Sequence, residues 1–214
     1  MNEKELVELH PTVWHVAFRS GWPSIWERGL LSAETLCNDY VDHDVTRRRM
    51  LSERRGTWTA FDVPGGGRFT LRDQRPVQPK ALLSSLKGGM TEEQWFRLVN
   101  RRVYFFVNES AALKLARRYR KEGQILLTFD TASLLKLVSE RVAVATINTG
   151  NTRRKPAPRG WDTFVALSHF KPGPRRIREL TVEGEIANIT DALTAVDEAC
   201  LNEEFCQIWP AATG

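Results

Sequence analysis

The sequence predicts a single α+β domain spanning residues 1–214, with six or seven short strands flanked by helices. Apolar runs of strand length recur along the chain, and helical patterns separate the early runs whereas loops separate the late ones. The 214 residues, of which 42% are hydrophobic and 27% charged, suffice for one sizeable core. Because strands and helices do not alternate strictly, we expect an α+β rather than an α/β arrangement.

The amino-terminal part predicts one strand, one helix and a long insertion. An apolar run predicts a strand at 13–18, and Pro23 and Gly29 bound a helix within 24–31. Residues 38–80 are polar, rich in arginine and interrupted by a Pro-Gly-Gly-Gly sequence, with one candidate strand at 67–71. We therefore expect a loop-rich insertion, and a loop of this length in a compact domain is usually functional.

The rest of the chain predicts shorter elements. Thr91 and Gln94 form a capping box in front of an apolar stripe, which predicts a helix at 90–100. The other expected elements are strands at 103–107, 124–129, 142–147, 161–167 and 177–182, and helices from a Ser110 cap to 121, from an Asp130 cap to 138, and from 190 to 201. The basic segment between the strands at 142–147 and 161–167 is predicted to be a surface loop.

The net charge of +5 is concentrated in arginine clusters around residues 47–55, 117–121 and 153–178. Clustered cations favour a polyanionic partner, with nucleic acid the first choice, although a single cluster is equally typical of a solvated helix face.

Cys37, Cys200 and Cys206 are too few and too scattered for a disulfide framework, and they lack the spacing of a zinc site, so we expect no metal. The first residues lack the apolar core of a signal peptide, and the sequence contains no apolar run long enough to cross a membrane and no glycine-rich nucleotide loop. We expect a cytoplasmic protein.

Three predicted strands each hold one residue that is unusual in its setting: His15, Tyr104 and Glu179. Each has an ordinary structural explanation. A histidine or tyrosine in an apolar strand is usually a satisfied core residue, and a glutamate on a strand usually faces solvent.

The flanking sequences resemble the motifs of the ADP-ribosyltransferases of the His-Tyr-Glu class, which include the poly(ADP-ribose) polymerases and the DarT-type enzymes. WHVA at residue 14 is similar to the family's Trp-His-Gly-Ser strand, and VYFF at residue 103 to its Gly-Ile-Tyr-Phe strand. RELTV at residue 178 is similar to the strand that opens with the family's glutamate. The resemblance covers most of the chain and implies a split β-sandwich fold.

The resemblance implies NAD as the donor of ADP-ribose and assigns roles to four residues. Glu179 would be the catalytic carboxylate, which stabilises positive charge on the ribose or activates the acceptor. Tyr104 would pack on the nicotinamide ring, and His15 would donate a hydrogen bond to a ribose hydroxyl. The backbone of Val16 would contact the nicotinamide carboxamide.

Arg72 is a further candidate, since its guanidinium is suited to the NAD pyrophosphate. A surface ion pair between Arg72 and Asp73 is an equally good interpretation of the same residues.

The chain departs from the family pattern at several positions. Val16 and Ala17 replace the Gly-Ser that follows the family's histidine, and Ile177 argues against the arginine-modifying branch. Glu183 and Glu185 compete with Glu179 for the catalytic role. We prefer Glu179 because it opens an apolar strand, whereas the other two flank a glycine.

These features predict an enzyme that mono-ADP-ribosylates DNA or RNA, as a toxin or phage-defence effector would, with an antitoxin or immunity protein as an expected partner. Trp161 or Phe170 would stack a base. The cations expected to bind the acceptor lie in the loops before Glu179: Arg153, Arg154, Lys171, Arg175 and Arg176. Two alternatives stay open, namely ADP-ribosylation of a protein or small molecule, and a non-catalytic nucleic-acid-binding module on the same fold.

Overall fold

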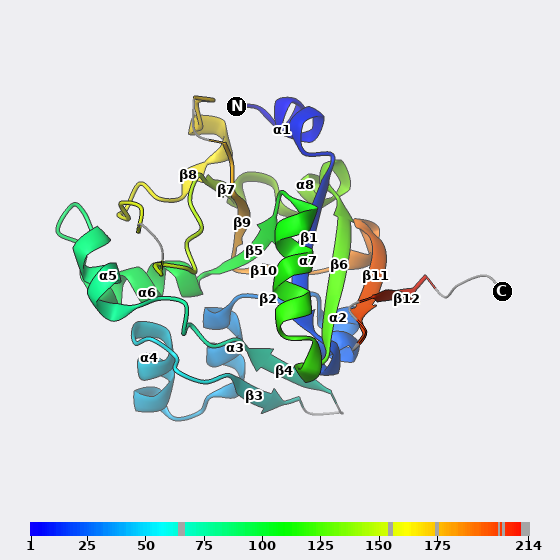
Figure 1. The fold of residues 1–214 in the computed structure, drawn as a ribbon, viewed down its shortest axis with the longest axis horizontal. Coiled ribbons are helices and arrows are strands. Elements are labelled where there is room, and N and C mark those ends of the chain that lie inside the picture. The colour runs from blue at the N-terminus through cyan, green and yellow to red at the C-terminus, as the bar shows by residue number, and fades with distance from the viewer. Residues whose placement is uncertain (64–66, 154–155, 174–175, 201, 203, 211–214) are drawn as a thin grey trace.

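A computed structural model describes residues 1–63, 67–153, 156–173, 176–200, 202 and 204–210 (Figure 1). An antiparallel sheet of eight strands runs through the molecule in the order β12-β11-β6-β1-β5-β9-β7-β8. Its strands are β1 (Thr12–Phe18), β5 (Arg102–Phe106), β6 (Gln124–Asp130), β7 (Val142–Ala145), β8 (Val165–Ala166), β9 (Glu179–Glu183), β11 (Leu193–Ala199) and β12 (Phe205–Trp209).

Two small sheets and eight α-helices complete the described part of the fold, which confirms the α+β class. The small sheets pair β2 (Leu30–Leu31) with β10 (Glu185–Ile186), and β3 (Thr59–Asp62) with β4 (Arg68–Leu71). The helices are α1 (Glu3–Leu9), α2 (Trp22–Arg28), α3 (Ala33–Tyr40), α4 (Asp44–Ser52), α5 (Pro79–Ser85), α6 (Glu92–Asn100), α7 (Glu109–Arg118) and α8 (Thr131–Val138). In the ranges described above, none of them has the length and apolar character needed to cross a membrane.

The main sheet divides between β1 and β5. β1 pairs with β6 over seven residues, from Thr12 to Phe18, but its register with β5 contains the single pair Trp14 and Phe106. The sheet therefore consists of two four-stranded halves that touch near one end and separate along the rest of β1 and β5.

The hydrophobic core covers both faces of the sheet around this division. The main cluster lies on one face and includes Val13, Phe105, Leu127, Phe129 and Leu180, all buried. On the other face α7 lies across β1 and β6 (Figure 1), where its Ala112 and Ala116 pack against Val16 and Leu126. Since neighbouring residues of a strand point to opposite faces, His15 shares the face of the main core.

The prediction of a loop-rich insertion at 38–80 is wrong in its first half. Helix α3 continues to Tyr40, α4 follows, and β3 pairs with β4 to form a hairpin. The candidate strand at 67–71 is confirmed as β4. Helix α4 was not predicted because it buries only Leu51, so its arginine-rich sequence shows almost no hydrophobic periodicity.

The predicted terminal helix at 190–201 is also wrong, because this segment forms β11 between β6 and β12. Its residues have reasonable helix propensity, but pairing with two neighbouring strands overrides that local preference. The strand expected at 161–167 is reduced to Val165–Ala166, and Asn108 rather than Ser110 caps α7. The predicted strands at 13–18 and 124–129 and the capping box of α6 are confirmed.

Gly29 ends α2 with a positive φ of 83°, and a Cβ at this position would lie 2.0 Å from the carbonyl oxygen of Ile186. We expect Gly29→Ala to destabilise the protein by about 3 kcal/mol, because both the backbone angle and the clash oppose it. Thermal unfolding should show a melting temperature lower by about 10 °C.

Gly56→Ala is the matched control, since a Cβ at this position would have no neighbouring atom within 4 Å. Its stability should change by less than about 0.5 kcal/mol. Equal melting temperatures for the two variants would contradict the role assigned to Gly29.

Candidate functional site

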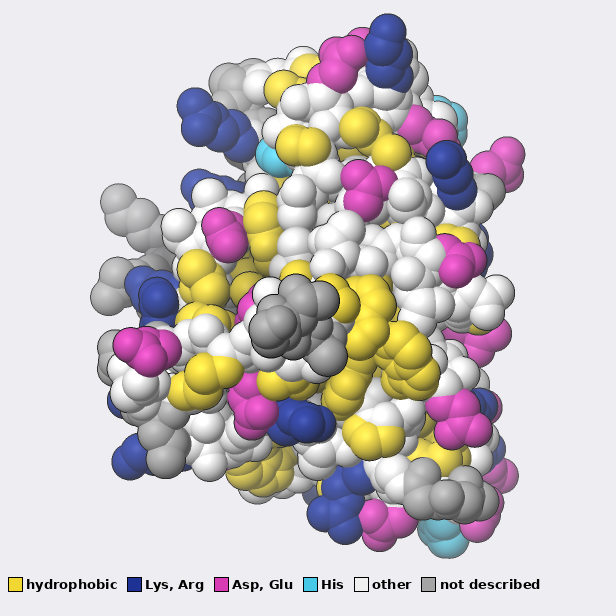
Figure 2. Space-filling model, turned by 90° about the vertical axis from the view of Figure 1, so that its right-hand side faces the viewer, with side chains coloured by type: hydrophobic (Ala, Val, Ile, Leu, Met, Phe, Trp, Pro, Cys, Tyr) yellow, Lys and Arg dark blue, Asp and Glu magenta, His cyan; other side chains and the backbone are white. Residues whose placement is uncertain are grey.

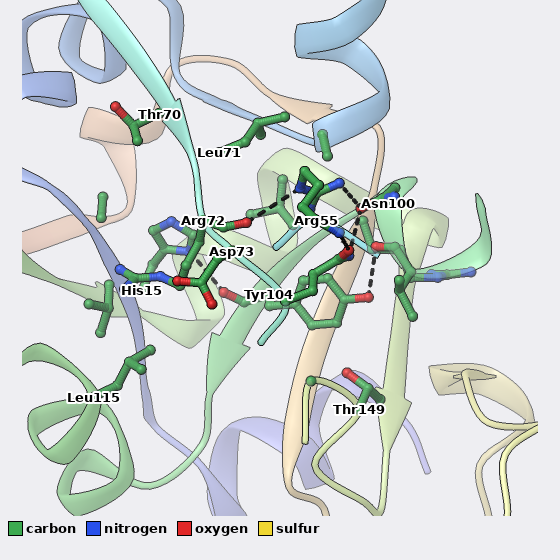
Figure 3. Close-up of a pocket in the computed structure, with 18 of the residues that line it drawn as sticks. His15, Arg55, Thr70, Leu71, Arg72, Asp73, Asn100, Tyr104, Leu115 and Thr149 are labelled. Atoms are coloured by element: carbon green, nitrogen blue, oxygen red, sulfur yellow. Dashed lines mark hydrogen bonds between the residues drawn. The ribbon is translucent and has the colours of Figure 1, made fainter. Parts of the chain in front are cut away.

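A cavity of about 440 Å³ lies where β1 and β5 separate (Figure 3). Its walls include residues of β1, β4, β5, α2, α3, α6 and α7, the turn at 148–151 and the first residue of β9. Five residues proposed from the sequence as catalytic or donor-binding line this cavity: His15, Val16, Arg72, Tyr104 and Glu179. The fold thus brings together residues from distant parts of the sequence.

His15 spans the gap between the two halves of the sheet. Its Nδ1 lies 2.8 Å from the carbonyl oxygen of Tyr104. Because a carbonyl oxygen only accepts, Nδ1 carries the proton and donates. Burial and, to a smaller extent, the charge of Arg72 lower the pKa of His15 to about 4 despite this hydrogen bond. The ring is therefore neutral at pH 7, and its Nε2 is an acceptor rather than the donor expected from the sequence.

Tyr104 is fixed by its hydroxyl group, which donates to the carbonyl oxygen of Val99 at 2.8 Å. Its ring lies edge-on to Phe164, with 6.1 Å between centroids. Burial and the nearby charge of Glu179 raise the pKa of the phenol well above its usual value. Tyr104 therefore presents a rigid, neutral aromatic ring to the cavity.

Glu179 is buried at the start of β9 and accepts hydrogen bonds from Thr149. The Thr149 hydroxyl donates to Oε2 at 2.7 Å, and the Thr149 backbone N–H lies 3.2 Å from Oε1. Burial raises the pKa of Glu179 to about 7, although the hydrogen bonds from Thr149 and the charge of Arg159 oppose the shift. A carboxyl group with this pKa exchanges a proton readily near neutral pH.

Arg159 holds the turn that carries Thr149. It is 1% exposed, and its guanidinium donates to the carbonyl oxygens of Asn148, Asn151 and Ala157 at 3.0, 2.7 and 2.7 Å. The prediction of a surface loop between β7 and β8 agrees with the exposed Asn148, Gly150 and Asn151, but it is wrong for Thr149, Thr152 and Arg159, which are buried. The sequence contained no signal for this, because Arg159 stands among other basic residues.

Arg72 lies at the other end of the cavity, between the rings of Phe18 and Tyr119, with 4.9 Å from its Cζ to each centroid. One guanidinium nitrogen, Nη2, donates to Gln124, whereas Nη1 is buried without a hydrogen-bond partner among the described residues. Asp73 pairs with Arg75 at 3.4 Å, so Arg72 is not half of a surface Arg–Asp pair. A buried cation with an unsatisfied donor favours an anionic ligand.

A polar network that the sequence did not reveal fixes the backbone next to Arg72 (Figure 3). Arg55 Nη1 donates to the Asn100 side chain at 3.0 Å, and Arg55 Nε lies 3.4 Å from the Arg72 carbonyl oxygen. Asn100 in turn donates to the Leu51 carbonyl oxygen at 2.9 Å. The segment at 38–80 is thereby tied to α6, and it supplies part of the cavity wall.

The predicted acceptor-binding cations that the structure describes lie outside the cavity lining. Arg153, Lys171 and Arg176 are exposed, and Arg154 and Arg175 lie outside the described residues. Of the two aromatic candidates for stacking, Trp161 is 57% exposed but Phe170 only 8%. The prediction for Phe170 is therefore wrong, since its ring packs in the core.

The competing glutamates are placed differently from Glu179. Glu183 forms ion pairs with Arg101 and Arg102, at 2.6 and 3.2 Å, and Glu185 is exposed on β10. Neither lines the cavity. In the part of the chain that the structure describes, no group of three or more His, Cys, Asp or Glu side chains is arranged to hold a metal ion.

Comparison with known proteins gives a family but no activity. Residues 11–193 match the family described as "Family of unknown function (DUF7002)". Since the match spans most of the 214 residues, the chain belongs to this family. No curated protein and no solved structure shows significant similarity to it.

The raised pKa of Glu179 predicts that the free energy of unfolding depends on pH. Between pH 4.5 and about 7 the folded protein keeps a proton that the unfolded chain has released, so Glu179 lowers stability as pH rises through this range. The loss amounts to about 3 kcal/mol. Glu179→Gln keeps the shape without the charge, and it should melt at a higher temperature than the wild type at pH 8 but not at pH 4.5.

The comparison isolates Glu179, because His15 is present in both proteins. The lowered pKa of His15 acts in the opposite sense, with stability present above pH 6.5 and lost as pH falls towards 4. A difference in melting temperature that does not grow between pH 5 and 8 would contradict the buried charge at Glu179.

Proposed function

We propose that this protein is an NAD-dependent ADP-ribosyltransferase of the His-Tyr-Glu class, on a split β-sandwich fold. The observation that carries the proposal is that His15, Tyr104 and Glu179, from three strands far apart in the sequence, line one cavity. The division of the main sheet between β1 and β5 supports the fold assignment, because a split β-sandwich is what the resemblance implies.

The cavity has features suited to NAD as the donor substrate. Its volume of about 440 Å³ lies in the range of about 300–1,000 Å³ that is common for small-molecule sites. The unsatisfied Nη1 of Arg72 would donate to a pyrophosphate oxygen, and the ring of Tyr104 would contact the nicotinamide. When bound, NAD supplies the ADP-ribosyl group, with nicotinamide as the leaving group.

Glu179 would perform the central chemical task. Breaking the bond from ribose to nicotinamide develops positive charge on the sugar, and a carboxylate in a buried site stabilises such charge strongly. With a pKa of about 7, Glu179 is also able to accept a proton from the attacking acceptor. Thr149 orients the carboxylate through its two hydrogen bonds.

His15 and Val16 would position the sugar and the leaving group. Neutral His15 would accept a hydrogen bond from a ribose hydroxyl at Nε2 while Nδ1 remains bound to Tyr104. Val16 and Ala17 have no hydroxyl, so the contact made by the family's serine is lost. Any contact with the carboxamide at this position is therefore made by the backbone.

We propose a nucleic acid as the acceptor. The segment 146–178 contains one acidic residue, Asp162, and several arginines and lysines. Four of its exposed cations, Arg153, Lys171, Arg176 and Arg178, form no ion pair with other described residues. Unpaired cations in the same segment as exposed Trp161 favour a ligand that has both phosphates and bases.

Incubation with labelled NAD and separate pools of DNA, RNA and protein tests the activity and its acceptor. Glu179→Gln should reduce transfer by about 10²- to 10⁴-fold, because the charge that stabilises the ribose is lost. The control Glu183→Gln should keep transfer within a few-fold, since that carboxylate lies outside the cavity.

Labelling of protein alone would replace the nucleic-acid acceptor with a protein acceptor. No label in any pool and no release of nicotinamide, from a protein that melts normally, would overturn the proposed activity.

Arg72→Met tests the donor site by calorimetric titration with NAD. Removal of a charge-assisted hydrogen bond should weaken binding by about 10- to 100-fold, since such bonds contribute about 1.5–3 kcal/mol. Arg68→Met is the matched control, because Arg68 begins β4, the strand that ends directly before Arg72, and lies outside the cavity lining. Equal affinity of both variants for NAD would exclude Arg72 from the donor site.

A further inference from the structure

Two of the three cysteines, Cys200 and Cys206, lie close together on the β11–β12 hairpin, and neither lines the cavity. Cys200 directly follows β11, and Cys206 is the second residue of β12, opposite Glu198. Their Sγ atoms are 2.8 Å apart. The Cys200 backbone N–H donates to the Glu204 carbonyl oxygen at 2.9 Å. The two thiols therefore face each other on a hydrogen-bonded frame.

The pair is chemically distinct from Cys37. Cys37 is fully buried, and burial raises the pKa of its thiol to about 11, so it is neither accessible nor ionised at neutral pH. Cys206 is exposed and Cys200 is partly exposed. An oxidant in solution therefore reaches this pair selectively.

We propose that Cys200 and Cys206 form a reversible intramolecular disulfide that fastens the edge strand β12 to β11. A disulfide requires the sulfurs to approach to about 2.04 Å, which is a movement of about 0.8 Å from their present separation. Such a small shift lies within the side-chain freedom of two exposed cysteines.

The reaction is thiol–disulfide exchange with a small-molecule disulfide such as oxidised glutathione. The Cys206 thiolate attacks one glutathione sulfur and releases one glutathione, and the Cys200 thiolate then attacks the Cys206 sulfur and releases the second. Two cysteine thiols are oxidised to one disulfide, one glutathione disulfide is reduced to two thiols, and the two protons pass to the released glutathiones.

The Cys200–Cys206 disulfide would stabilise a strand that packs against α2. In the described residues β12 pairs with β11 alone, and the ring of its Trp209 lies 5.7 Å from that of Trp26 in α2. Figure 2 shows apolar side chains grouped on this face of the molecule. Ile25, the neighbour of Trp26, lines the cavity, so fastening β12 stabilises the outer support of one cavity wall.

Equilibration of the full chain in glutathione redox buffers at pH 8, followed by alkylation and peptide mapping, tests the proposal. We expect a Cys200–Cys206 disulfide in oxidising buffer, with Cys37 remaining a thiol. Cys206→Ser should instead leave Cys200 as a mixed disulfide with glutathione, and Cys37→Ser should leave the intramolecular bond unchanged. Glutathione adducts alone in the wild type, a disulfide between two chains, or two free thiols in every buffer would overturn the proposal.

Thermal unfolding gives an independent readout that does not involve NAD. Closing this short loop should raise the melting temperature of the oxidised wild type by about 5 °C over the reduced form. The double variant Cys200→Ser/Cys206→Ser should melt at the same temperature in both buffers. If the oxidised wild type melts no higher than the reduced protein, the bond does not fasten the hairpin.

Discussion

The hydrogen bond from His15 to the Tyr104 carbonyl oxygen is the contact on which the geometry of the site depends. A sheet normally satisfies its backbone groups by pairing each strand with its neighbours. Where β1 and β5 separate, the groups that face the gap have no partner on the opposite strand, and the imidazole supplies one across the gap. The bond links the two halves of the sheet while leaving room between them. It also fixes the tautomer of His15, so a single contact sets both the shape and the polarity of the cavity centre.

Burial disfavours the charged form of an ionisable side chain at each end of the cavity. It raises the pKa of Glu179 and lowers that of Arg72, because in each case the charged form loses contact with water. Neither group is fully compensated by its neighbours: Glu179 has the donors of Thr149, and Arg72 has two aromatic rings and Gln124. Burying ionisable side chains that are incompletely paired lowers the stability of the fold. Such side chains are typical of binding and reactive sites rather than of hydrophobic cores.

The sequence predicted the elements whose signals are local. The strand of His15 and the helix begun by Thr91 follow from hydrophobic pattern and capping, and the three unusual residues were placed on the correct strands. Helix α4 was missed because it is almost wholly exposed, and β11 was mistaken for a helix because its neighbours are distant in the sequence. Arg159 and Thr149 were missed for a similar reason. Nothing near Arg159 in the sequence separates a buried arginine that holds a turn from the exposed cations beside it.

The order of the strands in the main sheet has a consequence for how the protein is made. β1 lies between β5 and β6, and β9 lies between β5 and β7, so the inner strands come from opposite halves of the chain. Contacts between such distant segments form late in folding, because long stretches of chain must first be brought together. During synthesis on a ribosome, β1 has no β6 to pair with until residues 124–130 have emerged, and the cavity is completed only after β9 has been synthesised. An incomplete chain therefore contains His15 without a site, and any chemistry at Glu179 begins only with the assembled sheet.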